Sequence, residues 1–148
     1  QPRRTQPPPA TIPINLECAR RNGTSPEIRE FVVPLCATIH LAGSIITITS
    51  CVVTVLMMNN MSYGISTIFP FILVLGVAMV AAPGAPGGAI MSALPFLGMV
   101  GIASNSPLAS LLIALYITQD SFGTAANVSG DNAIAIIVDW IYHRFIKK

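Results

Sequence analysis

Four oxygen-bearing side chains near the end of the chain recur at helical spacing: Asp120, Thr124, Asn127 and Asp131. At about 100° per residue they lie within about 60° of one another on an α-helix. A neighbouring face of the same helix carries three small residues, which let another backbone come close: Gly123, Ala126 and Gly130. Carboxylates at membrane depth are costly and normally face a cavity, so this polar stripe predicts a pathway for an ion or a small solute.

A second, milder polar stripe runs through the apolar stretch 31–58. Its members are His40, Ser44, Thr47, Cys51 and Thr54. We expect the hydroxyls of Thr47 and Thr54 to bond back to carbonyls of their own helix. Gly43, in the middle of the stretch, predicts either an unwound point or a close contact with another backbone.

The sequence Ala-Pro-Gly-Ala-Pro-Gly-Gly at 82–88 interrupts two apolar runs, 65–82 and 89–100. Two prolines and three glycines cannot continue a helix, yet the break carries no polar side chain. Irregular backbone inside hydrocarbon is tolerated only where protein or a cavity satisfies its polar groups. We therefore predict a re-entrant helical hairpin over 65–104 with its tip at 83–88. The alternative is two short spans joined by a tight turn.

The composition is that of a membrane chain. Of 148 residues, 53% are hydrophobic and 9% are charged, against roughly 25% charged residues in soluble domains. We therefore expect the lipid bilayer as a partner. The net charge of +2 is too small to indicate binding to nucleic acid. Three cysteines without a CxxC spacing indicate neither a disulfide framework nor a zinc site, and we interpret them as apolar packing residues: Cys18, Cys36 and Cys51.

The predicted fold is an all-α membrane protein with two full crossings and the re-entrant hairpin between them. Basic residues flank the apolar region on both sides, which places both ends in the cytoplasm of a multi-pass protein of the cell membrane. The proline-rich residues 1–9 are expected to be a disordered or foreign tail, and the absence of an initiating Met indicates a fragment. The elements that follow are 10–22, 25–58, 65–104 and a last transmembrane helix over 107–145.

Four segments in order carry a resemblance to a known family: ATIPINLECA (10–19), FVVPLCATIHLAGS (31–44), GAPGGAIM (84–91) and DSFGTAANVSGD (120–131). They resemble the C-terminal part of the dicarboxylate/amino acid:cation symporters, which include the sodium-coupled glutamate and neutral amino acid transporters. The resemblance extends over nearly the whole chain but only about the last third of a member. It implies a partial transport domain of the glutamate-transporter-like fold.

By this resemblance, each element takes a part in transport. The segment 10–22 is the returning arm of a first re-entrant hairpin, and 25–58 is an interrupted transmembrane helix. The hairpin over 65–104 gates the site, and the helix over 107–145 binds the substrate. Full-length members form homotrimers through helices that this chain lacks, so we do not expect this chain to form trimers.

The resemblance also implies the site residues. The substrate-binding positions are Ser44, Ala85, Gly87, Gly88, Asp120, Thr124 and Asn127. Asp120 is expected to hold the amino group of the substrate. A coupling sodium ion is expected at Asn127 and Asp131, with main-chain carbonyls near His40, because carboxylate, amide and carbonyl oxygens suit a hard cation. No cofactor is expected beyond the coupling ion, which is sodium or a proton.

Two departures from the family pattern bear on the substrate and the ion. Where members read Asn-Met-Asp-Gly-Thr, this chain has His-Leu-Ala-Gly-Ser at 40–44. The loss of the acid at Ala42 leaves the number of coupled ions, and sodium dependence itself, open. Acidic-substrate members carry an arginine where this chain has Gly123, and a guanidinium is the natural partner of a second carboxylate. We therefore expect transport of a neutral or small polar amino acid, with a dicarboxylate or acidic amino acid as the alternative.

Three other functions are alternatives to symport for a chain with these residues. An intramembrane aspartyl hydrolase would need Asp120 and Asp131 to share a proton, but one helix holds them about 16 Å apart. We therefore predict that the chain is not an enzyme. A channel remains an alternative, as does a truncated membrane fragment that does not transport. The last possibility arises because, by the resemblance, half of the transport machinery is absent. Gln6–Pro9 stand where the family has the serine-rich tip of its first hairpin.

Overall fold

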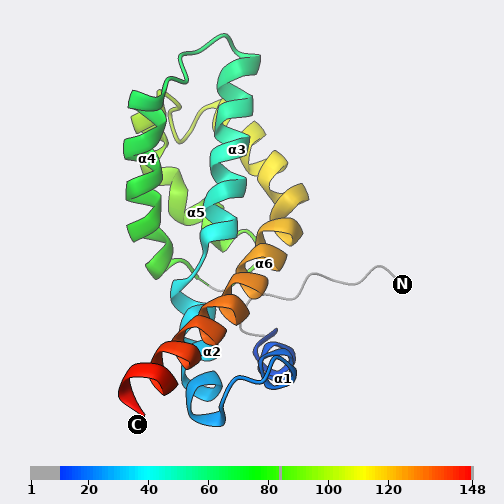
Figure 1. Cartoon of the computed structure of the whole chain (residues 1–148). Helices are drawn as coiled ribbons and strands as arrows, with labels where there is room; N and C mark the ends of the chain where they lie inside the picture. The colour runs from blue at the N-terminus through cyan, green and yellow to red at the C-terminus, as the bar shows by residue number, and fades with distance from the viewer. Residues whose placement is uncertain (1–10, 84, 148) are drawn as a thin grey trace, which may run out of the picture.

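The structure, a computed structural model, describes residues 11–83 and 85–147, which form helices without any β-strand (Figure 1). The predictions for residues 1–9, for position 10 and for Gly84 lie outside the described residues. In chain order the elements are α1 (Ile12–Arg21), α2 (Pro26–Ile39), α3 (Ala42–Met58), α4 (Ile65–Ala78), the 3₁₀ helix η2 (Met79–Ala81), α5 (Gly88–Ala93), the 3₁₀ helix η3 (Leu94–Val100), α6 (Pro107–Ile141) and the π-helical turn η4 (Tyr142–Ile146).

The long helix α6 runs the length of the molecule and contacts α1, α2, α3 and η4. Its first half packs against α3, and its second half packs against α2 and α1 (Figure 1). Ser106 caps its start by accepting a hydrogen bond from the backbone N–H of Ala109 at 3.2 Å, and Pro107 occupies the first turn, where no backbone donor is needed. Every side chain of the polar stripe is therefore positioned by one rigid element.

The apolar stretch after Ser25 is one helix in two pieces. α2 ends at Ile39 and α3 begins at Ala42, with His40 in an extended conformation at φ −104° and ψ 94°. Among the described residues, the combined stretch 26–58 is the only one long and apolar enough to cross a membrane. α6 is longer, at 35 residues, but is not apolar enough over any stretch long enough to cross. A second crossing over 107–145 stays a prediction.

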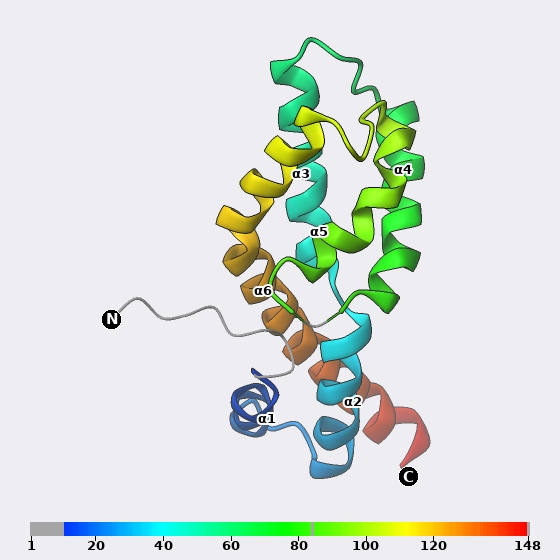
Figure 2. The same cartoon turned by 180° about the vertical axis from the view of Figure 1, so that it is seen from behind.

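Two helical arms form a hairpin between α3 and α6. α4 continues through η2, the chain reverses between Ala82 and Gly87, and α5 with η3 returns beside α4 (Figure 2). Gly87 adopts the left-handed conformation at φ +76°, which a residue with a Cβ rarely adopts. The proline- and glycine-rich segment thus forms the tip of a helical hairpin. That this hairpin is re-entrant in a membrane stays a prediction.

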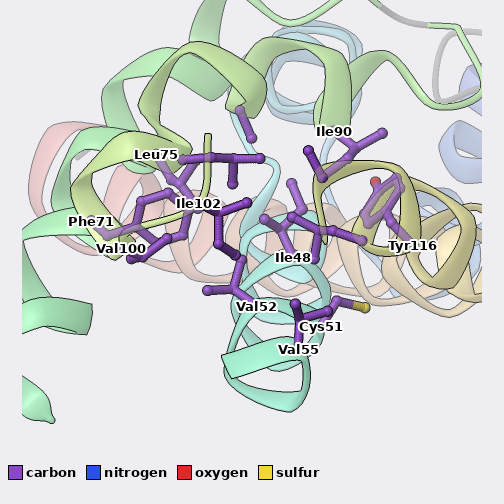
Figure 3. Close-up of a cluster of buried hydrophobic side chains, with 14 of the residues drawn as sticks. Ile48, Cys51, Val52, Val55, Phe71, Leu75, Ile90, Val100, Ile102 and Tyr116 are labelled. Atoms are coloured by element: carbon purple, nitrogen blue, oxygen red, sulfur yellow. The ribbon is translucent and has the colours of Figure 1, made fainter. Parts of the chain in front are cut away.

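The main apolar core fills the space between α3, the two hairpin arms and α6. Figure 3 shows side chains from all four converging, among them Ile48, Phe71, Ile90 and Tyr116. A smaller cluster joins α1, α2 and α6. Cys51 is buried in the first cluster and Cys36 in the second, as the packing interpretation expects. For Cys18 that interpretation is wrong, because the residue lies on the exposed face of α1.

Many large apolar side chains point outward. Six of the more exposed come from α3, α4 and α6: Ile46, Ile65, Leu73, Val77, Phe122 and Ile137. So many exposed large apolar side chains in one chain favour an interface with lipid or protein. It agrees with the low content of charged residues and with the bilayer expected around the chain.

The backbones of α3 and α6 approach closely where the two helices cross. A Cβ at Gly43 would collide with the carbonyl oxygen of Gly123 and lie 2.6 Å from the Cβ of Ala126. Gly43 is helical rather than unwound, so the close-contact reading of this glycine is the correct one. Both glycines are buried, and their lack of side chains lets the two backbones meet.

We predict that Gly43→Ala destabilises the complete protein carrying this chain by about 1–3 kcal/mol, because the methyl group forces α3 away from α6. Gly76→Ala is the matched control: Gly76 also lies within a helix, but a Cβ there meets nothing within 4 Å. Thermal unfolding in detergent measures both. Equal midpoints for the two variants would show that the crossing does not depend on Gly43.

Candidate functional site

A cavity of about 200 Å³ lies between the hairpin tip, the broken helix and the middle of α6. Its lining residues are Ala37, Thr38, Leu41, Ser44, Val80, Ala81, Ala82, Pro83, Ala85, Ala89, Tyr116, Asp120 and Thr124. Most of the wall is apolar, and a few hydroxyls and one carboxylate converge on the space. This mixture is typical of a pocket for a small solute.

Asp120 is the charged group of the cavity. One carboxylate oxygen accepts a hydrogen bond from the Tyr116 hydroxyl at 2.8 Å, and the other accepts one from the backbone N–H of Gly87 at 3.3 Å. Asp120 thus joins the last helix to the hairpin tip. The carboxylate is half-buried and borders the cavity, where a bound cationic group can reach it.

The structure brings four of the predicted substrate residues to the cavity wall: Ser44, Ala85, Asp120 and Thr124. Gly87 and Gly88 lie at the tip but are not part of that wall; Gly87 acts through its bond to Asp120. Asn127 is also absent from the wall. The sequence reasoning missed Tyr116, although it precedes Asp120 by four residues and extends the same polar stripe by one turn.

Asn127 ties α6 to the start of α3. Its side chain is 3% exposed. The amide oxygen accepts a hydrogen bond from the backbone N–H of Gly43 at 2.8 Å, and the amide nitrogen donates to the Ser44 hydroxyl at 3.0 Å. Because helix α3 begins at Ala42, the Gly43 N–H has no partner within the helix. Asn127 supplies that partner and orients Ser44 at the cavity.

Asp131 lies further along α6 and is 2% exposed. Its Oδ1 is 2.9 Å from Nδ1 of His40, and its Oδ2 accepts a bond from the Asn15 side chain at 3.4 Å. Asn15 is itself bonded by Asn132. The carboxylate therefore connects α6 to α1 and to the break between α2 and α3.

These residues suit a hard cation by chemistry, but their oxygens are already engaged. His40 and Asn15 approach the two oxygens of Asp131, and the amide oxygen of Asn127 faces the N–H of Gly43. Among residues 11–83 and 85–147, no three His, Cys, Asp or Glu side chains are grouped as metal ligands. A sodium ion at Asp131 would share these oxygens with donors of the protein itself, because each carboxylate oxygen has a second lone pair.

The milder polar stripe of α3 divides into two groups. Thr47 donates to the carbonyl of Gly43 at 2.9 Å and Thr54 donates to that of Ser50 at 2.8 Å, which confirms the predicted bonds back to the helix. His40 and Ser44 instead contact side chains of α6. The site residues therefore come from the N-terminal end of the stripe.

A family model described as the sodium:dicarboxylate symporter family matches residues 4–141. The serine/threonine transporter SstT of Acinetobacter baylyi is 31% identical over 132 residues, which are 88% of this chain and 33% of that protein. The neutral amino acid transporter A of Bos taurus is 26% identical over 140 residues, or 94% of this chain and 26% of that protein. The chain spans about a third of the length of the first of these relatives. No solved structure matches the chain.

We predict that Asn127→Ala lowers the stability of the complete protein by about 1–3 kcal/mol, because the buried N–H of Gly43 loses its partner. Asn59→Ala is the control, since Asn59 is exposed and the carbonyl of Val55 to which its side chain bonds also accepts from the Asn59 backbone N–H and so keeps a partner. Thermal unfolding compares the two variants. A smaller loss for Asn127→Ala than for Asn59→Ala would contradict the role given to Asn127.

Proposed function

The chain belongs to the sodium:dicarboxylate symporter family, and from that premise we propose that it forms the substrate-binding part of a secondary active amino acid transporter. The substrate is a neutral or small polar amino acid, and sodium is the coupling ion. The family and the relatives are named as symporters or transporters rather than as enzymes. Because the chain spans about a third of its relatives, the transport cycle is proposed for the complete protein.

One observation carries the proposal: a single carboxylate, Asp120, borders the cavity, and no lysine, arginine or histidine is among the described residues that line it. An α-ammonium group pairs with a carboxylate through strong charge-assisted hydrogen bonds. A second carboxylate on an acidic substrate would find no counter-charge and would be costly to bury. This charge pattern favours a neutral amino acid over aspartate, glutamate or a dicarboxylate.

The remaining wall is compatible with a small polar side chain. Ser44, Tyr116 and Thr124 contribute hydroxyls, and the volume of about 200 Å³ lies below the roughly 300–1,000 Å³ of pockets for larger ligands. Gly123, where the resemblance places an arginine in acidic-substrate members, is buried: a Cβ there lies 3.1 Å from the Thr47 hydroxyl. The names of the relatives, serine/threonine and neutral amino acid transporters, point in the same direction.

The hairpin tip is proposed as the gate. Ala82, Pro83 and Ala85 cover one side of the cavity, and the bond that holds the tip to Asp120 is long, at 3.3 Å. When the ammonium group of a substrate binds the Asp120 carboxylate, it replaces the weak hydrogen bond from the Gly87 N–H. Broken helices and hairpins that meet at mid-membrane are a recurring way to build transporter sites.

In the complete protein, we assign 10–22 to the arm of the first hairpin and 107–145 to the last membrane span. We assign the C-terminus to the cytoplasm.

Two alternatives remain beside this proposal. The family description names dicarboxylates, but the absence of a cationic group among the described lining residues argues against a dianionic substrate. The other alternative is that the chain is a membrane fragment that does not transport by itself. Uptake by cells expressing the complete protein and, separately, residues 1–148 distinguishes these cases.

We predict that the complete protein, reconstituted in liposomes, takes up serine, threonine or alanine with a half-saturating concentration at least about tenfold below that of aspartate. The reason is that burying the second carboxylate of aspartate without a counter-charge costs binding free energy, and each 1.4 kcal/mol of that cost weakens binding about tenfold. Competition between radiolabelled serine and unlabelled aspartate measures the ratio. Equal or better competition by aspartate would overturn the neutral-substrate proposal.

We predict that Asp120→Asn weakens serine binding by about 10–100-fold, the loss expected for a hydrogen bond to a charged group. Asp139→Asn is the matched control, because Asp139 lies near the other end of α6 and bonds to Ser25 rather than to the cavity. Isothermal titration of both purified variants compares them. Equal serine affinity for both variants would show that Asp120 does not bind the ammonium group.

A further inference from the structure

The His40 ring lies directly against the Asp131 carboxylate, at which the coupling cation is proposed to bind. Its Nδ1 lies 2.9 Å from Oδ1 of Asp131, and the side chains are 24% and 2% exposed, respectively. His40 lies in the two-residue break between α2 and α3, where the backbone leaves the helical conformation. The imidazole is therefore presented to α6 by irregular backbone rather than by a regular helix.

The surface of α6 is shaped to receive this ring. A Cβ at Gly130 would collide with Cε1 of His40 and lie 3.3 Å from both ring nitrogens. Gly130 precedes Asp131 directly, so the missing side chain leaves room for the ring beside the carboxylate. Two independent features, the bond to Asp131 and the ring packed on Gly130, thus hold the imidazole in one place.

We propose that His40 is an internal competitor for the coupling cation: its imidazole fills the site at Asp131, and sodium binds there only when the ring leaves. This inference rests on the proposed sodium-coupled transport. Asn15 engages the second oxygen of Asp131 at 3.4 Å, so the carboxylate offers no oxygen without a protein partner. The apparent sodium affinity is then the intrinsic affinity reduced by the fraction of molecules in which His40 is displaced.

Displacement of His40 also connects the cation site to the cavity. The break at His40 and Leu41 leads directly into Gly43 and Ser44, which Asn127 holds through its two hydrogen bonds. Leu41 and Ser44 both line the cavity. Movement of the break upon sodium binding therefore changes the backbone that presents these two residues to the substrate.

The test uses the complete protein in detergent, with thermal unfolding measured across sodium chloride concentrations at constant ionic strength maintained with choline chloride. We predict that His40→Asn lowers the half-saturating sodium concentration by about tenfold or more, because the competing state is removed. His143→Asn is the matched control, since His143 bonds to Asp139 near the end of α6 and should leave the sodium curve unchanged. His40→Gln provides a second variant should His40→Asn fail to fold.

A sodium curve that is unchanged in the folded His40 variants, or that shifts to higher concentration, overturns the proposal, because His40 would then be neutral or a supporting ligand. The absence of any sodium effect in the wild type and the variants also overturns it. Serine titrated into the same samples separates the two proposals: stabilisation by serine without a sodium response refutes competition by His40 while leaving amino acid binding intact. The double variant His40→Asn/Asp131→Asn must not show the lower half-saturating sodium concentration of His40→Asn, because the carboxylate that binds the ion is then absent.

Discussion

The structure depends on a single constraint: polar groups that are buried among apolar helices need partners within the protein. The helix break after Ile39 frees backbone groups at the start of α3, and α6 brings amide and carboxylate side chains to the same depth. Asn127 accepts from the backbone N–H of Gly43, and Asp131 pairs with the side chain of His40, which the break presents to α6. A break without the polar stripe, or a stripe without the break, would leave buried groups without partners.

This mutual dependence explains why the cavity lies where it does. α3 and α6 approach closely at Gly43 and Gly123, and the bonds made by Asn127 set the register between them. Asp120, lying before these contacts on the same rigid helix, is thereby positioned beneath the hairpin tip. At Asp120 the tip itself adds only the 3.3 Å bond from the Gly87 N–H, whereas the arms behind the tip pack into the main core through residues such as Ile90.

The sequence predicted much of this arrangement because periodicity and helix breakers are local signals. The spacing from Asp120 to Asp131 indicated one polar face, and the prolines and glycines at 82–88 indicated a reversal. Which partner each polar side chain takes depends on helix packing, which spacing does not encode. Tyr116 therefore went unnoticed as a partner of Asp120, His40 was expected to act through nearby carbonyls rather than its ring, and Cys18 was assigned to the interior although it lies outside.

The central claim is that an amino acid binds between Asp120 and the hairpin tip, on a site fixed by the contacts of α6 with the broken helix. The most direct measurement is a cryo-electron microscopy structure of the complete protein with serine and sodium bound. The account predicts density for serine in the cavity, with its amino group within hydrogen-bond distance of the Asp120 carboxylate. Serine bound elsewhere, with Asp120 turned toward lipid, would contradict it.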